Sequence, residues 1–95
     1  MPTVQVAALG TARKLLGFSS SEVALEKATV ADLLRDLKTV DGCTLYDHLV
    51  CEGRLRGDFA VMVNGLSLKS DQLGTNLQGG DHVVAMAILR HLHGG

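Results

Sequence analysis

The sequence has little of several features on which whole classes of protein depend. Only 3% of its 95 residues are aromatic and tryptophan is absent, so few side chains are available to stack on nucleic-acid bases. Lysine and arginine number 9 against 10 acidic residues, for a formal net charge of -1. That balance argues against the basic surface that dominates binding to phosphate backbones. We therefore expect no nucleic-acid partner.

Long apolar runs and cysteine-rich spacing are also missing. No stretch approaches the ~18 apolar residues that a membrane-spanning helix needs, and residues 1–9 begin a strand pattern without the basic region of a secretory signal. Cys43 and Cys51 are the only cysteines, and nothing else indicates an oxidising compartment, so free thiols are expected. These absences predict a cytoplasmic protein with no membrane partner.

What is present predicts one α+β domain over residues 1–89. The chain is 46% hydrophobic and 20% charged, which is typical of soluble globular domains. Thr29 and Thr44 each precede an aspartate by three residues, a spacing that resembles a capping box at a helix start. Apolar periodicity predicts helices over residues 11–16, 29–39 and 44–51, strands over 3–8, 22–26, 59–64, 66–68 and 83–89, and a loop over 52–58.

The last predicted strand is apolar on both faces, which favours a place inside the sheet. If it lies beside the first strand, the two run parallel and the helices pack across one face. This is a β-grasp arrangement with a mixed sheet. Its open face then carries Ala60, Met62 and one register of the last strand. We interpret Ala60 and Met62 as partner-binding residues, and ordinary sheet residues are the alternative.

The chain ends in Arg90-His91-Leu92-His93-Gly94-Gly95. Residues 90–95 are expected to form a flexible tail, which fully extended reaches ~20 Å. A frayed terminus without function is the simpler interpretation. Glycine suits a tail that enters another protein's active site, because it has no Cβ to block close approach.

Several short motifs occur together with this tail. They are Val63-Asn64-Gly65, then Leu77 followed by Gly80-Asp81-His82-Val83, the early turn over residues 9–13, and the terminal Gly94-Gly95. With these motifs in this order, the chain resembles the ubiquitin-like sulfur carrier family. That family includes the small subunit of molybdopterin synthase, the thiazole-synthesis sulfur carrier and the archaeal small modifier proteins.

The resemblance implies a carrier and not an enzyme. An E1-like enzyme would use ATP and magnesium to adenylate Gly95, and a sulfur donor protein would convert it to a thiocarboxylate. Gly94 would thread into the partner's active site. The chain itself would bind no cofactor.

The resemblance leaves the acceptor of Gly95 open. Sulfur donation to the large subunit of molybdopterin synthase, for molybdenum cofactor biosynthesis, is the first expectation. Thiamine synthesis and tRNA thiolation are related possibilities. In modifier members, a lysine of a target protein captures the activated carbonyl.

The residues before the glycines are expected to contact the activating partner. They are Arg90, His91, Leu92 and His93. Ubiquitin has arginines where this chain has His91 and His93, and histidine is mostly neutral at pH 7. We therefore expect an activating partner adapted to this tail.

A metal-linked binding module is the alternative from another functional class. Cys43, His48 and Cys51 have metal-binding side chains, and on one helix His48 and Cys51 would share a face. A structural zinc site normally has four ligands, and only His91 or His93 could add one. We therefore predict no metal site, and expect two half-buried thiols and a surface histidine.

Overall fold

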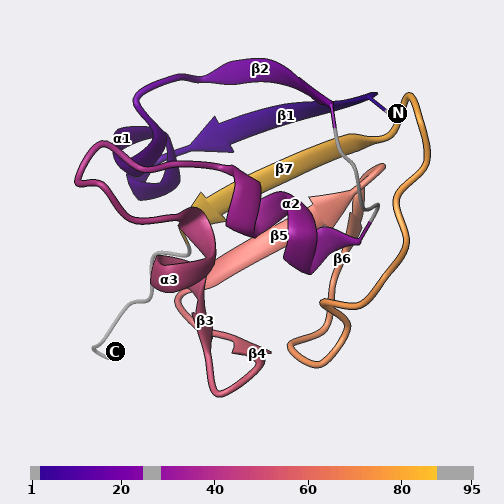
Figure 1. Ribbon diagram of the computed structural model, residues 1–95. Coiled ribbons are helices and arrows are strands. Elements are labelled where there is room, and N and C mark those ends of the chain that lie inside the picture. Colours follow the sequence, from indigo (N-terminus) through magenta and orange to yellow (C-terminus); the bar gives the residue numbers. More distant parts are fainter. Residues whose placement is uncertain (1–2, 25–28, 88–95) are drawn as a thin grey trace, which may run out of the picture.

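The fold is organised around a central strand, β7 (His82–Ala87), which lies between β1 (Thr3–Leu9) and β5 (Phe59–Val63). A computed structural model describes residues 3–24 and 29–87. Strands β2 (Ser20–Ala24) and β6 (Leu66–Ser67) form the two edges, which gives the order β2-β1-β7-β5-β6 (Figure 1). The predicted mixed sheet is therefore confirmed.

The parallel pairing expected if the last strand lies beside the first is present. β7 pairs in parallel with β1, with Val83 opposite Val6, and antiparallel with β5, with Ala85 opposite Val61. All four of these side chains are at most 1% exposed. The strand that is apolar on both faces is thus the central one, which pairs with a neighbouring strand on each side, as expected.

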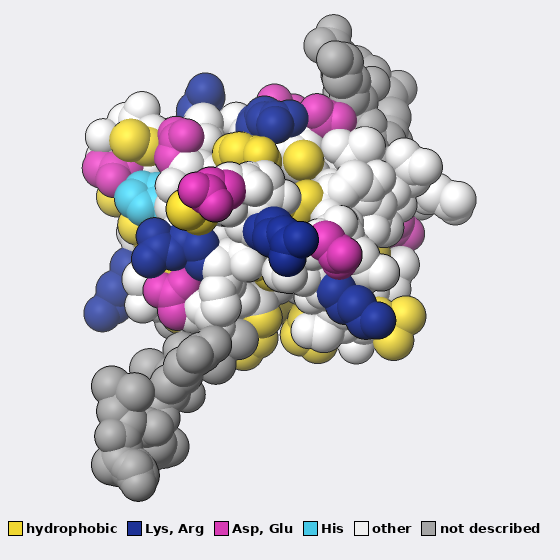
Figure 2. Space-filling view, turned by 90° about the horizontal axis from the view of Figure 1, so that it is seen from below, with side chains coloured by type: hydrophobic (Ala, Val, Ile, Leu, Met, Phe, Trp, Pro, Cys, Tyr) yellow, Lys and Arg dark blue, Asp and Glu magenta, His cyan; other side chains and the backbone are white. Residues whose placement is uncertain are grey.

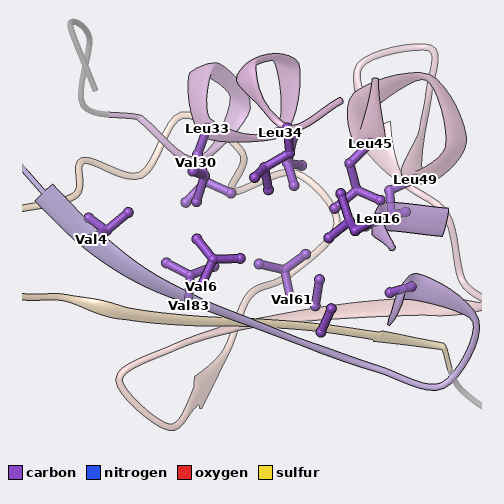
Figure 3. Close-up of a cluster of buried hydrophobic side chains, with 14 of the residues drawn as sticks. Val4, Val6, Leu16, Val30, Leu33, Leu34, Leu45, Leu49, Val61 and Val83 are labelled. Atoms are coloured by element: carbon purple, nitrogen blue, oxygen red, sulfur yellow. The ribbon is translucent and has the colours of Figure 1, made fainter. Parts of the chain in front are cut away.

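Within residues 3–24 and 29–87, three helices cover one face of the sheet. They are α1 (Thr11–Leu16), α2 (Val30–Asp36) and α3 (Leu45–Leu49). Leu33, Leu34 and Leu45 are fully buried, and Figure 3 shows them pointing toward the valines of the strands. Full burial of one such side chain contributes about 1.5–3 kcal/mol, so this layer holds the short helices in place.

Both predicted helix starts are confirmed, but both helices end early. The Thr29 and Thr44 hydroxyls accept hydrogen bonds from the backbone N–H three residues on, and Thr44 forms a complete capping box with Asp47. The predicted end at residue 39 is wrong, because Leu37 is extended and its carbonyl accepts from Leu45 N–H. This hydrogen bond to the first residue of α3 takes the place of the next helical turn.

The predictions for residues 44–51 and 52–58 need correction. α3 stops at Leu49, and Val50–Cys51 forms β3, which pairs with β4 (Arg54–Leu55). The turn between them uses positive φ at Glu52 (53°) and Gly53 (77°). A Glu-Gly pair lacks the asparagine or aspartate that usually announces such a hairpin, so the sequence indicated only a loop.

Some predictions fall on residues that the structure leaves out. Part of the strand expected over 22–26, the end of the strand expected over 83–89, and the tail 90–95 lie outside the described residues. The domain boundary at residue 89 therefore stays a prediction. Among the residues that are described, no helix is long and apolar enough to cross a membrane.

Candidate functional site

The described part of the chain ends in the central strand of the sheet. Ala87, the last described residue, pairs with Phe59 in the centre of the sheet. β7 points toward the end of the molecule where α1 and α3 lie (Figure 1). The candidate site residues Arg90, His91, Leu92, His93, Gly94 and Gly95 lie outside the described residues, so their roles remain predictions.

The sheet face without helices carries a continuous apolar surface, which we call the open-face patch. Met62 lies opposite Val84, and Ala60 lies opposite Met86. Across β7, Ala7 and Leu9 lie opposite the same two residues. The patch therefore consists of six residues from three strands: Ala7, Leu9, Ala60, Met62, Val84 and Met86.

The predicted placement of Ala60 and Met62 on the open face is confirmed, and their role in binding stays a prediction. The structure identifies the exposed register of the last strand as Val84 and Met86. It also adds Leu9, whose side chain is 50% exposed. Alternation in the first strand signals this, because Val6 points inward and Leu9, three residues on, therefore points outward.

The face seen from below the view of Figure 1 has a different character. Acidic and basic side chains alternate over it, with small apolar areas between them (Figure 2). In the described part of the molecule as a whole, Arg56 pairs with Asp58 at 3.5 Å, and Arg35 pairs with Asp32 at 3.8 Å. No field of a single charge covers this face, in keeping with the near-zero net charge.

The motif residues Asn64 and Asp81 join two turns at one end of the sheet. The Asn64 amide donates to Asp81 Oδ1 at 3.1 Å, and Asn64 Oδ1 accepts from His82 N–H at 2.9 Å. The Gln78 backbone N–H and the Asn64 amide both donate to Asp81, and they hold the pKa of its carboxyl below the ordinary value. These residues are engaged in structure and are not free for chemistry.

A groove of about 670 Å³ with a mixed polar and apolar lining lies beside these turns, between the β5–β6 hairpin and the segment before β7. Four of its polar side chains already bond within the protein. Gln72 accepts from Lys69 N–H, Thr75 donates to the Gln72 carbonyl, and Asn64 and Asp81 bond each other. These four side chains are therefore engaged in holding the walls of the groove.

The metal-capable residues are not arranged as the sequence suggested. Cys51 lies in β3, so it does not share a helix face with His48. The structure instead places Asp41 with Cys43 and His48, with one ligand atom from each within 4.8 Å of the others. Both thiols are free, as predicted, but they are exposed and not half-buried. Asp41 was missed because a lone surface aspartate carries no sequence signal.

Solved structures similar to this chain share its fold. The HVO 2177 protein of Haloferax volcanii is 28% identical with a TM-score of 0.72, over 99% of this chain and 87% of that chain. The putative molybdopterin converting factor subunit 1 of Pyrococcus furiosus is 23% identical with a TM-score of 0.69, over 94% and 100%. Small archaeal modifier protein 1 of H. volcanii is 20% identical with a TM-score of 0.71, also over 94% and 100%.

The comparison of sequences identifies the family. A search of curated proteins gave no match. The sequence model of the ThiS family, however, matches residues 6–95. The match begins within β1 and includes Gly94-Gly95. This match and the shared fold agree with the resemblance seen in the motifs. The chain belongs to the ThiS family of ubiquitin-like sulfur carriers.

Proposed function

We propose that this protein carries sulfur as a thiocarboxylate on Gly95. The observation that carries the proposal is the family match, which runs through Gly94-Gly95. Members of the family are small carrier proteins whose partners perform the catalysis. We assign the same division of labour here, with an E1-like enzyme and a sulfur donor protein as partners.

The chemistry follows from the weakness of a carboxylate as an electrophile. A Gly95 carboxylate oxygen attacks the α-phosphorus of ATP, and magnesium-bound pyrophosphate leaves. The resulting acyl adenylate has AMP as a good leaving group. A persulfide on the donor displaces AMP and forms an acyl disulfide. A second thiol of the donor then attacks the donor's own sulfur, which forms a disulfide on the donor and releases Gly95 as the thiocarboxylate.

The described domain supports this role as a docking platform. β7 is held on both sides by β1 and β5, so the strand that precedes the tail in the sequence is anchored in the centre of the sheet. The open-face patch adds an apolar surface of the kind that marks partner sites. We assign this patch to the E1-like enzyme and to the protein that receives the sulfur.

Sulfur transfer to a molybdopterin precursor is our first proposal for the pathway. It is supported by the similarity to the putative molybdopterin converting factor subunit 1. A large synthase subunit is then the receiving partner. Other thiolation pathways use the same Gly95 chemistry and differ only in that partner.

Intact-mass spectrometry tests the thiocarboxylate directly. The full chain is incubated with the host's E1-like enzyme, ATP, magnesium and a sulfur source. The expected result is a mass gain equal to the difference between sulfur and oxygen, which is absent from a variant that lacks Gly95. Absence of both this product and an AMP adduct, with an enzyme that activates another carrier, would overturn the proposal.

A matched pair of variants tests the docking role of the open-face patch. Met62→Asp places a charge in the middle of the patch, and we expect it to weaken binding to the E1-like enzyme at least about tenfold, or about 1.4 kcal/mol. Ser70→Asp introduces the same charge at an exposed position after β6, outside the patch. Equal affinities for the two variants would show that the enzyme docks elsewhere.

Protein modification is the second candidate. The similarity to small archaeal modifier protein 1 favours it. In this reaction a lysine amine displaces AMP from activated Gly95, which forms an isopeptide bond and releases a proton. Tagged protein expressed in its host should then yield branched Gly95–lysine peptides after digestion. Recovery of free protein alone would count against this function.

A further inference from the structure

A group of three different metal-binding side chains comes from the loop between α2 and α3 and from α3 itself. Asp41, Cys43 and His48 each place one potential ligand atom within 4.8 Å of the other two. His48 Nε2 is 3.0 Å from Asp41 Oδ2. Cys43 is exposed, and the side chains of His48 and Asp41 are 29% and 48% exposed. A solute ion therefore has direct access to all three.

The carboxylate of this group is held in position by its own loop. Asp41 Oδ1 accepts a hydrogen bond from the hydroxyl of Thr39, a residue only 6% exposed, and another from Cys43 N–H at 3.3 Å. The Thr39 hydroxyl is the main reason that the pKa of Asp41 lies below its ordinary value. The carboxylate is therefore ionised at neutral pH, and its second oxygen faces His48.

The loop and the helix that carry these side chains are both anchored. Thr39 N–H donates to the Cys43 carbonyl at 2.9 Å, and Val40 N–H donates to the Leu15 carbonyl in α1 at 2.8 Å. His48 is on α3, where Leu45 and Leu49 are fully buried. Ligands fixed by buried structure lose less conformational freedom when an ion binds.

We propose that Asp41, Cys43 and His48 form a surface binding site for a divalent transition metal of the zinc type. Ligands at about 2.0–2.3 Å from a tetrahedral zinc lie about 3.3–3.6 Å from one another. The histidine and aspartate atoms are already close to that separation, and rotation of the exposed Cys43 side chain brings in the sulfur. The Thr39 hydroxyl acts as the outer partner that orients the carboxylate.

The donor set determines the class of metal. Calcium and magnesium prefer oxygen ligands alone, whereas thiolate and imidazole favour zinc, cobalt and related ions. Binding deprotonates the Cys43 thiol and releases that proton to solvent. Three protein ligands leave the fourth position open to water or to a donor from a partner, as in non-structural zinc sites.

Cobalt(II) provides a test that reports the thiolate ligand and the coordination geometry. The full-length protein is reduced, freed of metal and titrated with Co²⁺ while its absorption spectrum is recorded. We expect one ion per chain, a thiolate-to-cobalt charge-transfer band in the near ultraviolet, and the intense visible bands of tetrahedral cobalt. Added Zn²⁺ should remove these bands by displacing the cobalt.

Variants separate this site from the other candidate ligands. Cys43→Ala should abolish the charge-transfer band, and His48→Ala should weaken cobalt binding at least about tenfold. Cys51→Ala is the matched control, because Cys51 is equally exposed but lies on the β3–β4 hairpin. The double variant His91→Ala/His93→Ala controls for binding by the tail. Both controls should keep the spectrum, and far-ultraviolet circular dichroism verifies that each variant is folded.

Three results would overturn the proposal. One is the absence of a charge-transfer band at cobalt concentrations up to about 1 mM, the limit of weak specific binding. Another is a band that survives Cys43→Ala but disappears in Cys51→Ala. The third is loss of cobalt binding in the tail variant, which would assign the metal to His91 and His93.

Discussion

Substitutions of Asn64 test how the Asn64-Gly65 turn and the Gly80–Val83 motif stabilise this fold. Asn64 has a positive φ of 52° in the tight turn between β5 and β6. Its side chain also bonds to His82 N–H and to the Asp81 carboxylate. Replacement by glycine removes the side-chain bonds but permits the backbone conformation. Replacement by alanine removes the bonds and also strains the backbone.

The two effects have different magnitudes. A hydrogen bond of the kind made with His82 N–H contributes about 0.5–1.5 kcal/mol, and added freedom of the unfolded chain costs a glycine variant about 0.4–1 kcal/mol. A left-handed conformation costs a residue such as alanine roughly 1–2 kcal/mol. We expect a loss of about 1–2 kcal/mol for Asn64→Gly and about 2–3 kcal/mol for Asn64→Ala.

Urea unfolding followed by circular dichroism measures these losses. The midpoint should fall in the order wild type, Asn64→Gly, Asn64→Ala, with an unchanged slope. In thermal unfolding, each 1 kcal/mol corresponds to about 4–8 °C for a domain of this size. Ser70→Ala, at an exposed position on the neighbouring loop, should stay within about 0.5 kcal/mol of wild type.

Two outcomes would refute this reasoning. If Asn64→Gly is as stable as wild type, the side-chain bonds contribute nothing. If Asn64→Ala is more stable than Asn64→Gly, the backbone conformation is not the constraint we infer. Well below their unfolding temperature, both variants should still become activated at Gly95, because Asn64 acts on the fold and not on the reaction.

Further predictions concern the core, a helix cap and the response to acid. Leu33→Ala should lower the free energy of unfolding by about 2–5 kcal/mol, because Leu33 is fully buried, whereas Val40→Ala, at a position 71% exposed, should change it little in the same urea titration. Thr44→Ala removes a complete capping box and should cost about 0.5–2 kcal/mol, most of which Thr44→Ser restores. The folded pKa of Asp81 lies below the ordinary value of 3.8, so its contribution to stability is complete above that value and is lost as the pH falls through the folded pKa. Asp81→Asn should therefore flatten the dependence of the unfolding midpoint on pH in this acidic range, and an unchanged slope would show that its hydrogen bonds are not formed.

Local sequence signals predicted the parts of the fold that local physics controls. The alternation of valines in β1 and β5 identified their buried faces, and Asn64-Gly65 identified the hairpin. Thr29 and Thr44 identified two helix starts. Helix ends were less predictable, because the carbonyl of Leu37 accepts from Leu45 instead of continuing its own helix. Such a choice depends on where another segment packs.

The candidate site residues also fall into those that the sequence predicted and those that only the structure brings together. Sequence alone pointed to Gly94-Gly95, to Ala60 and Met62, and to a family that the comparison with the ThiS sequence model then showed. It could not join Leu9 to Met86 or Asp41 to His48, since these pairs meet only through strand register and the path of a loop.

The sequence by itself thus determined the central position of β7, the buried faces of β1 and β5 and the family, because hydrophobic periodicity and turn chemistry act over a few residues. Only the tertiary structure decided the six-residue extent of the open-face patch and the exchange of Cys51 for Asp41 beside Cys43 and His48. The physical reason is that both depend on contacts between segments distant along the chain. Such contacts are determined by packing of the whole core and leave no local pattern to read.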